Sequence, residues 1–410
     1  MDNVLLGQNG SLMRRHNRSL VLRVLRNQSP ISRRRISEQI GLGAATVTNL
    51  VAELIEDGLV DEVGSSPARS VEGGRTQVLL GLRPRAALVA GIHFGVRHVL
   101  VAVGDLRGTL LKSSAIPRPK GGGPEESVRV AALTLGQMRE ELGLAGGALL
   151  AAGVSTPAIV DADRGMIEHA PELGWPVSVP IAELVERATG MPVVLDNSRR
   201  SMLLAESLFG VAQGARNAIL LHVATTIGAG LLVDYRIVRG DRNAAARLGH
   251  LIVQEGGPRC ECGGLGCLNA IAGEQVLVAR AARELGRPIH AQELYELAAQ
   301  GDETSRRLLA DAARAIGSAL LSTVLLLDCE LVVVAGWITA AGAAFLDPLR
   351  AVVGEHAERV TGRAPRIVPS MFGADVLVAG AVSLALEKHV YRMAQVRDGR
   401  RAAHDVVATN

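Results

Sequence analysis

One histidine and three cysteines form the most informative group in this 410-residue sequence. Cys260, Cys262 and Cys267 lie within eight residues of one another, and His250 precedes them by ten. A tetrahedron of one nitrogen and three sulfur ligands is a common structural zinc site. Glycines between the cysteines allow a short loop to fold its sulfurs onto one point. A chance cluster or a disulfide pair is the alternative, which this spacing disfavours. The group therefore predicts a bound structural Zn²⁺.

The net charge of +3 is unevenly distributed along the chain. Residues 1–86 carry 12 arginines and 8 acidic residues, and residues 1–35 carry eight arginines and a single acid, Asp2. A basic end on a nearly neutral body predicts an anionic partner for that end. Aromatic residues make up only 2% of the chain, which argues against a single-strand binder built on base stacking.

The basic end has the pattern of a DNA-binding helix-turn-helix. Apolar residues at helical spacing predict three helices, over residues 12–26, 33–40 and 44–57. Ser32 is placed to cap the second helix, and a Gly-Leu-Gly turn joins the second helix to the third. In such a motif the last helix lies in the major groove. Its outward side chains Thr46, Thr48 and Asn49 are therefore predicted to read base edges of duplex DNA.

Two short strands, 59–63 and 76–81, follow the third helix and enclose a loop rich in serine and glycine. This arrangement predicts a wing, with Arg75 beside it and able to enter a minor groove. Three consecutive arginines at the start of the second helix are predicted to contact phosphates: Arg33, Arg34 and Arg35. The alternative is a three-helix interaction module whose arginines are merely solvated.

The pattern of apolar runs divides the chain into four parts. Residues 1–82 form the predicted winged helix-turn-helix, and 83–86, with Pro84, form a linker. Residues 87–390 contain two similar α/β halves, which predict a ligand cleft between them. Residues 391–410 are charged and small, and we expect a poorly ordered tail. No secretory or membrane-spanning segment is predicted, so we expect a cytoplasmic protein.

The large segment resembles the ROK family of repressors, open reading frames and sugar kinases. The family motif Cys-x-Cys-Gly-x-x-Gly-Cys is matched in full at 260–267, and Gly249-His250 precedes it. Further matches are Val154-Ser155-Thr156-Pro157, Gly174-Trp175, Ile227-Gly228-Ala229-Gly230 and Gly380-Ala381. The resemblance implies an actin-like, ribonuclease-H-like α/β fold of two lobes, with zinc on His250, Cys260, Cys262 and Cys267. A winged helix in front implies the repressor branch.

Several positions depart from the pattern of the family's kinases. Ser198 stands where the resemblance implies the catalytic aspartate, and His93 and Arg247 replace two further acids. Asn269, Thr226 and Trp337 also differ from the residues usual in the kinases. Asp196 remains as a displaced candidate base. Because a general base alone contributes about 10²–10⁴-fold, we predict that the protein is not an enzyme.

The cleft is instead predicted to bind an effector. The candidate residues are Asn197, Ser198, Arg247, His250 and Asn269. Either Arg247 attracts an anionic ligand such as a phosphorylated sugar, or Arg247 pairs with Asp196 or Glu172 and fills the site. The resulting hypothesis is a homodimeric or homotetrameric transcriptional regulator, a repressor of carbohydrate-related genes on double-stranded operator DNA. The alternatives are an active sugar kinase with a DNA-binding appendage and a ligand-independent regulator with a degenerate cleft.

Overall fold

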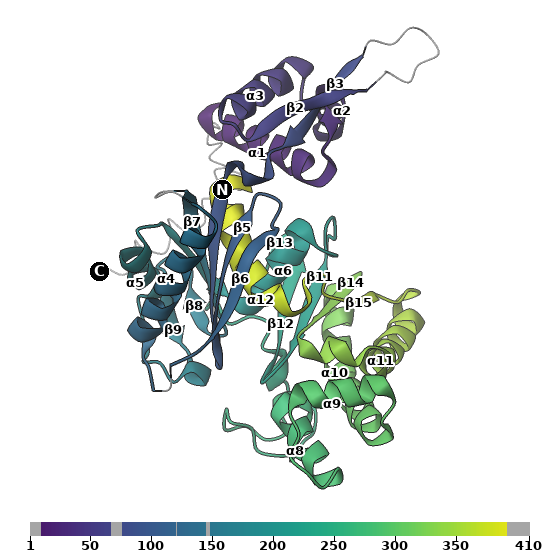
Figure 1. Cartoon of the computed structure of the whole chain (residues 1–410). Coiled ribbons are helices and arrows are strands. Elements are labelled where there is room, and N and C mark those ends of the chain that lie inside the picture. The colour runs from purple at the N-terminus through teal and green to yellow at the C-terminus, as the bar shows by residue number, and fades with distance from the viewer. Residues whose placement is uncertain (1–9, 67–75, 120, 145–147, 392–410) are drawn as a thin grey trace, which may run out of the picture. The chain divides into compact units, whose positions relative to one another are not determined.

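The computed structural model describes residues 10–66, 76–119, 121–144 and 148–391 (Figure 1). The chain divides into two compact units. The first unit contains residues 1–87 together with 105–107 and the segment from Leu386 onward, and the second contains residues 88–104 and 108–385. The chain thus passes between the units at several points, whereas the sequence pattern predicts a single linker at 83–86.

The first unit has three helices and a three-stranded antiparallel sheet of order β1-β3-β2. The elements are α1 (Gly10–Gln28), β1 (Ile31–Ser32), α2 (Arg33–Ile40), α3 (Ala44–Glu56), β2 (Val60–Ser66) and β3 (Gln77–Leu82). Ser32 caps α2, because its side chain accepts a hydrogen bond from the Arg35 amide, and Gly41 ends this helix at φ +66°. These elements confirm the predicted winged helix-turn-helix to within a few residues at each boundary.

Tyr391 differs from its prediction as the first residue of a tail. Its side chain is fully buried in the first unit. Its hydroxyl donates to the Leu106 carbonyl, and its own carbonyl accepts from the Ser19 hydroxyl at 2.7 Å. The Arg26 guanidinium lies 4.9 Å from the ring centroid. A large ring that finds an apolar site on α1 is ordered by burial, which local composition does not indicate. Residues 392–410 lie outside the described part of the chain.

The second unit contains two five-stranded sheets, β10-β7-β4-β5-β6 and β13-β12-β11-β14-β15. The first comprises β4 (Leu88–Phe94), β5 (His98–Asp105), β6 (Leu110–Pro117), β7 (Leu149–Thr156) and β10 (Val193–Asn197). The second comprises β11 (Ala218–Val223), β12 (Ile227–Val233), β13 (Arg236–Ile237), β14 (Leu331–Ala335) and β15 (Arg366–Pro369). Each sheet places its strands in the order third, second, first, fourth, fifth. This repetition confirms the two predicted α/β halves.

The parallel strands at the centre of each sheet are continuous apolar runs, as expected for strands covered on both faces. Every residue of β4, β11 and β14 is buried. The helices that follow β6 are α4 (Pro124–Glu141), α5 (Ile181–Thr189), α6 (Ser198–Phe209), α7 (Leu268–Ala272), α8 (Glu274–Glu284), α9 (Ala291–Gln300), α10 (Glu303–Leu327), α11 (Ala343–Thr361) and α12 (Val376–Leu386). A small hairpin is formed by β8 (Ile159–Asp161) and β9 (Met166–His169).

Glycines allow α12 to pack very closely on its neighbours within the second unit. A Cβ at Gly153 in β7 would lie 1.8 Å from the Ala381 carbonyl oxygen of α12. On the other side, a Cβ at Gly380 would lie 2.8 Å from the Met202 amide nitrogen of α6. The helix α12 therefore contacts both the first sheet and α6. A side chain at Gly153 would push α12 away from β7, and one at Gly380 would push it away from α6.

The described residues include one helix, α10, that is long and apolar enough to cross a membrane by length and composition alone. Its buried residues, among them Leu308, Ile316 and Leu320, belong to the hydrophobic core that also includes residues of β11, β12 and β14 in the second sheet. The polar side of its first half makes ion pairs through Arg307, Asp311 and Arg314. This pattern is that of a core helix in a globular domain.

Candidate functional sites

The exposed face of α3 carries the predicted base-reading residues. Val47, Leu50, Val51 and Leu54 turn one face of this helix into the core of the first unit. Thr46, Thr48 and Asn49 lie on the opposite, exposed face. The Thr48 hydroxyl donates to the Ala44 carbonyl at 2.8 Å, so its oxygen is still free to accept a hydrogen bond. The structure thus brings all three side chains to one accessible surface.

The arginines at the start of α2 differ in their partners. Arg33 pairs with Glu62 at 2.9 Å, and Arg34 pairs with Glu38 at 2.8 Å. Arg35 is exposed and has no ion pair among the described residues. Surface pairs of this kind contribute about 0–1 kcal/mol, so a DNA phosphate can compete for these guanidinium groups. Arg75 lies outside the described residues.

The four predicted metal ligands come together in the second unit, in the segment between β13 and α7. The ligand atoms of His250, Cys260, Cys262 and Cys267 all lie within 4.8 Å of one another. The Cys262 and Cys267 sulfurs are 3.7 Å apart, and the Cys260 sulfur lies 3.9 Å from the His250 Nδ1. Two sulfurs bound to one tetrahedral zinc at about 2.3 Å are separated by about 3.8 Å. The cysteines form no disulfide, and the residues fit a structural Zn²⁺.

The loop that carries these ligands depends on its glycines. Gly266 has φ +72°, and a Cβ there would lie 1.7 Å from the Gln254 carbonyl oxygen. Gly264 faces the metal group, and a Cβ there would lie 3.3 Å from the Cys267 sulfur. Cys267 occupies the position directly before α7, without a capping hydrogen bond from its side chain. The metal loop therefore fixes the position of α7 and of Asn269 in its first turn.

A small cleft lies beside the metal group. Its lining residues include Glu172, Asn197, Arg199, Thr226, Gly228, Arg247, His250 and Asn269. The space available to the centre of a water molecule is about 20 Å³, close to the volume that one water needs. Four of the five predicted effector residues line the cleft, whereas Ser198 is buried and is not among its lining residues.

Two of the lining amides have structural hydrogen bonds. The Asn197 Oδ1 caps α6 by accepting from the Arg199 amide at 2.9 Å, and its Nδ2 donates to the Ala158 carbonyl at 2.8 Å. The Asn269 Oδ1 accepts from the Ile227 amide at 2.8 Å. Both side chains therefore hold the backbone of the cleft in place, and Asn269 links the metal loop to the first residue of β12.

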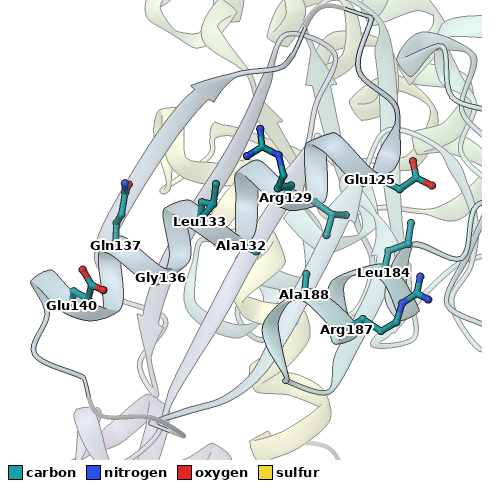
Figure 2. A pocket seen from close by; sticks show the side chains of 11 residues that line it. Glu125, Arg129, Ala132, Leu133, Gly136, Gln137, Glu140, Leu184, Arg187 and Ala188 are labelled. Carbon is teal, nitrogen blue, oxygen red and sulfur yellow. The ribbon is translucent and has the colours of Figure 1, made fainter.

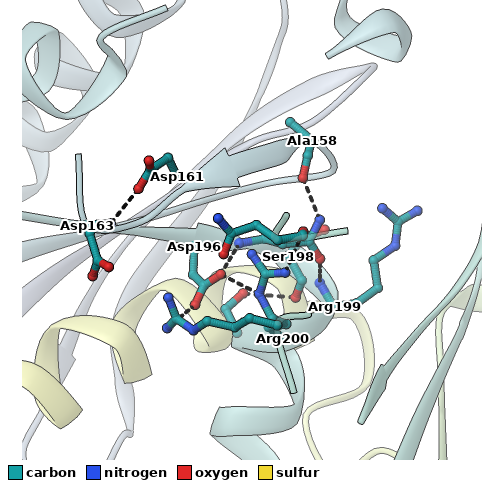
Figure 3. Close-up of polar contacts among 11 residues, drawn as sticks. Ala158, Asp161, Asp163, Asp196, Ser198, Arg199 and Arg200 are labelled. Carbon is teal, nitrogen blue, oxygen red and sulfur yellow. Dashed lines mark hydrogen bonds and ion pairs between the residues drawn. The ribbon is translucent and has the colours of Figure 1, made fainter. Parts of the chain in front are cut away.

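The Asp196 carboxylate is occupied by two arginines that the sequence pattern does not pair with it (Figure 3). Its Oδ1 accepts from Arg200 Nε at 2.6 Å, and its Oδ2 lies 2.7 Å from an Arg239 nitrogen. In the described chain Arg247 has no ion pair with Asp196 or Glu172, so the predicted pairing that would fill the site is not observed. Asp196, only 3% exposed, is likewise badly placed to act as a displaced base.

Arg199 is a functional candidate that the sequence analysis missed. It is 7% exposed, and its side chain points away from Asp196 and Arg200 (Figure 3). Its Nη2 donates to the Thr226 hydroxyl at 2.7 Å. A Cβ at Gly228 would lie 2.6 Å from the Arg199 Nε. The signal in the sequence is its position, because Arg199 directly follows Asn197 and Ser198, which are both predicted as effector residues.

Two buried histidines lie near Arg199. The His93 Nδ1 lies 2.9 Å from the Ser155 hydroxyl. Burial, reinforced by the Arg199 charge, lowers the pKa of His93 to about 3. Burial and the same guanidinium lower the pKa of His222 to about 3. Both rings are therefore neutral at pH 7, and neither offsets the positive charge of Arg199.

A much larger groove of about 680 Å³ lies elsewhere in the second unit, between α4 and α5 (Figure 2). Its lining includes the small and apolar residues Ala132, Leu133, Gly136 and Ala188 together with the charged residues Arg129, Arg187, Glu125 and Glu140. Arg129 already pairs with Glu126, and Arg187 with Glu183. The groove is open and lacks convergent polar groups, so the small cleft is the better ligand site despite its size.

Comparison with known proteins agrees with this arrangement. Residues 89–388 match the ROK family, and residues 14–61 match a family described as winged helix-turn-helix DNA-binding. The chain therefore belongs to the ROK family, with a winged helix-turn-helix in front of the ROK domain.

Similar curated proteins are transcriptional regulators. The xylose repressor of Caldicellulosiruptor bescii is 26% identical over 361 residues, which span 85% of this chain and 90% of that protein. The DNA-binding transcriptional dual regulator NagC of Escherichia coli K12 is 26% identical over 362 residues, 85% of this chain and 87% of that protein.

Solved structures show the same fold. A ROK family transcriptional regulator, described as a homolog of the E. coli MLC protein, aligns with a TM-score of 0.77 at 23% identity, over 93% of this chain and 98% of that chain. A ROK family glucokinase from Streptomyces griseus, solved with glucose and AMPPNP, aligns with a TM-score of 0.64 at 26% identity. That alignment covers 73% of this chain and 99% of the glucokinase.

Proposed function

We propose that this protein is a DNA-binding transcriptional regulator of carbohydrate-related genes, and that its ROK domain senses a sugar-related effector without kinase activity. The observation that carries the proposal is the exposed Thr46, Thr48 and Asn49 face of α3 within a winged helix-turn-helix. The xylose repressors and NagC, which are similar over most of their length, support the same conclusion. The protein would act in the cytoplasm, as a dimer or tetramer on a two-fold symmetric operator.

The first experiment maps the DNA that the protein occupies across its genome and then measures binding to a recovered site. Specific binding should be strongly salt-dependent, because guanidinium groups displace counterions from phosphates. We expect occupied sites next to genes for sugar uptake or metabolism. A purified protein that binds no duplex in a salt-dependent manner would refute the regulator.

The main alternative is an active sugar kinase with a DNA-binding appendage. Two features disfavour it: the Asp196 carboxylate is engaged by two arginines, and the position of a further family acid holds His93, which is buried and neutral. Phosphoryl transfer needs a base for the sugar hydroxyl and a place for metal and nucleotide. A coupled assay with ATP and glucose, N-acetylglucosamine, mannose or xylose should therefore show no turnover, and robust turnover would establish the kinase instead.

The second alternative is a regulator with a degenerate cleft that binds no ligand. A ligand that binds the folded state must raise its thermal stability. Stabilisation by a sugar or sugar derivative, lost when Arg247 is changed, would exclude this alternative. Zinc fits the proposal as a structural ion, because the metal loop positions Asn269 at the edge of the cleft.

A further inference from the structure

The cleft contains two positive charges that no carboxylate in hydrogen-bonding range offsets. Arg199 and Arg247 both line it, and neither has an ion pair within the part of the chain that the structure describes. Arg200, the next residue of α6, provides the contrast, because it pairs with Asp196 at 2.6 Å. The sequence Arg199-Arg200 therefore places one guanidinium in a buried ion pair and the other in the cleft.

Arg199 is buried more than nine-tenths but is only partly satisfied. Its Nη2 has the Thr226 hydroxyl as an acceptor, whereas its Nε has no hydrogen-bond partner in the described structure. Burial lowers the pKa of this guanidinium, the more distant Glu172 carboxylate raises it, and Arg247 lowers it further. A buried cation of this kind is unfavourable unless an anion accompanies it.

The groups around Arg199 include few negative charges. Arg199 lies in the first turn of α6, a twelve-residue helix whose amino-terminal end favours anions. The imidazoles of His93 and His222 are neutral and carry no compensating charge. Thr226 adds a hydroxyl that can rotate to donate. Glu172 is the one acidic residue among those that line the cleft.

We infer that the cleft recognises a phosphate monoester, such as a phosphorylated sugar, and that Arg199 holds the phosphate while Arg247 provides the second cationic contact. The inference rests on the proposed function, because it names the chemical class of the effector. A phosphate dianion matches two guanidinium groups in charge, and its oxygens match the planar fork of arginine. Because the cleft now has room for about one water, ligand entry requires it to widen.

The test measures thermal stability and calorimetric affinity of the full-length protein with inorganic phosphate and a panel of hexose and pentose phosphates. The neutral parent sugars and glucuronate serve as comparison ligands, which separate a phosphate from a sugar or carboxylate requirement. We expect at least one phosphorylated sugar to stabilise the wild type more than its parent. Stabilisation by none of the phosphates, or stronger stabilisation by a neutral sugar or by glucuronate, would overturn the inference.

Variants assign the effect to Arg199. Arg199→Met should weaken binding of the best phosphate about 10- to 100-fold, because a charge-assisted hydrogen bond is lost. Its ligand-free stability should equal or exceed that of the wild type, since the substitution removes an uncompensated buried charge. Arg247→Met, at a half-buried position, should also weaken phosphate binding without threatening the fold. Arg242→Ala is the matched control, because it removes one exposed positive charge outside the cleft.

The outcomes distinguish this inference from the proposed function. Unchanged phosphate affinity in Arg199→Met and Arg247→Met would show that the phosphate binds elsewhere and would refute the inference. Duplex binding is measured on the same preparations. A protein that binds operator DNA but responds only to a neutral sugar remains a regulator, and only the phosphate site fails. If the protein binds a sugar phosphate but no duplex, the phosphate site is supported and the proposed regulator is refuted.

Discussion

At the scale of single residues, Asn49 of α3 and Arg35 of α2 are expected to contribute differently to DNA binding. Asn49 can make two hydrogen bonds to an adenine, whereas Arg35 can bind a phosphate, which is the same for every base. Both side chains are exposed on the first unit, and Asn49 belongs to the face opposite the buried Val47 and Leu50. Removing them should therefore have different consequences for binding.

Asn49→Ala is expected to cost about 1–3 kcal/mol on the specific operator and little on random duplex DNA. Arg35→Ala is the control, and it should weaken binding to both and reduce the salt dependence by about one phosphate contact. Titrations of both variants at several salt concentrations measure these effects. An equal loss on both duplexes in Asn49→Ala would show that Asn49 does not read a base.

The two buried histidines predict acid sensitivity of the second unit. Folding lowers the pKa of His93 and of His222 from about 6.5 to about 3. Above pH 6.5 both rings are neutral in the folded and unfolded states, so they do not affect stability there. As the pH falls below 6.5 the unfolded chain takes up protons that the folded chain refuses. At pH 5 each histidine should therefore reduce the free energy of unfolding by about 2 kcal/mol.

His222→Leu tests this dependence. The variant should lose less stability than the wild type between pH 7 and pH 5, as followed by denaturant unfolding at each pH. His356→Ala provides the control, because His356 is an exposed histidine of α11. If the wild type and His222→Leu lose the same stability over this interval, the burial of a neutral His222 is not the cause.

At the scale of elements, the metal loop connects its four ligands to the cleft. Cys267 directly precedes α7, and Asn269 in the first turn of that helix accepts from the Ile227 amide at 2.8 Å. His250 belongs to both the metal group and the cleft lining. A metal bound by these four residues would fix the start of β12, and its loss should loosen the cleft as well as the loop.

The protein should purify with about one zinc per chain, and Cys262→Ser should lower this content substantially. The loss of about 3 kcal/mol of metal-coupled folding energy would lower the melting temperature by roughly 5–10 °C. Cys329→Ala should leave the metal content unchanged, because Cys329 lies apart from the metal group. Metal analysis and thermal unfolding check both statements, and a freshly folded wild type free of zinc would disprove them.

The sequence predicts those features that depend on residues close together in the chain. The spacing of His250 and the cysteines identifies the metal group, and apolar runs indicate the buried central strands β4, β11 and β14, because burial on both faces requires apolar side chains throughout. The partners of Asp196 and the burial of Arg199 depend on how α6 approaches β12 through Gly228 and Gly230. Such contacts arise from tertiary packing and have no sequence periodicity of their own.

At the scale of the whole molecule, the first unit is not a simple amino-terminal domain. It includes residues 105–107 and the segment from Leu386 to Tyr391. The buried Tyr391 ring contacts Arg26 of α1, and Arg23 pairs with Glu387 at 3.0 Å. The stability of the DNA-binding unit therefore depends on residues at the carboxyl-terminal end of the ROK match, such as Glu387, and just beyond it, such as Tyr391.

Tyr391→Ala should remove a fully buried ring and cost the first unit about 3–4 kcal/mol. Tyr391→Phe keeps the ring and loses only the hydrogen bond to the Leu106 carbonyl, so it should cost about 1 kcal/mol. Hydrogen exchange at the amides of α1 and α3 reports on this unit, while amides of β11 and β14 report on the second. Protection should fall in α1 and α3 of Tyr391→Ala and persist in β11 and β14, and operator binding should weaken with it. Undiminished protection of α1 would mean that the DNA-binding unit folds without its carboxyl-terminal segment.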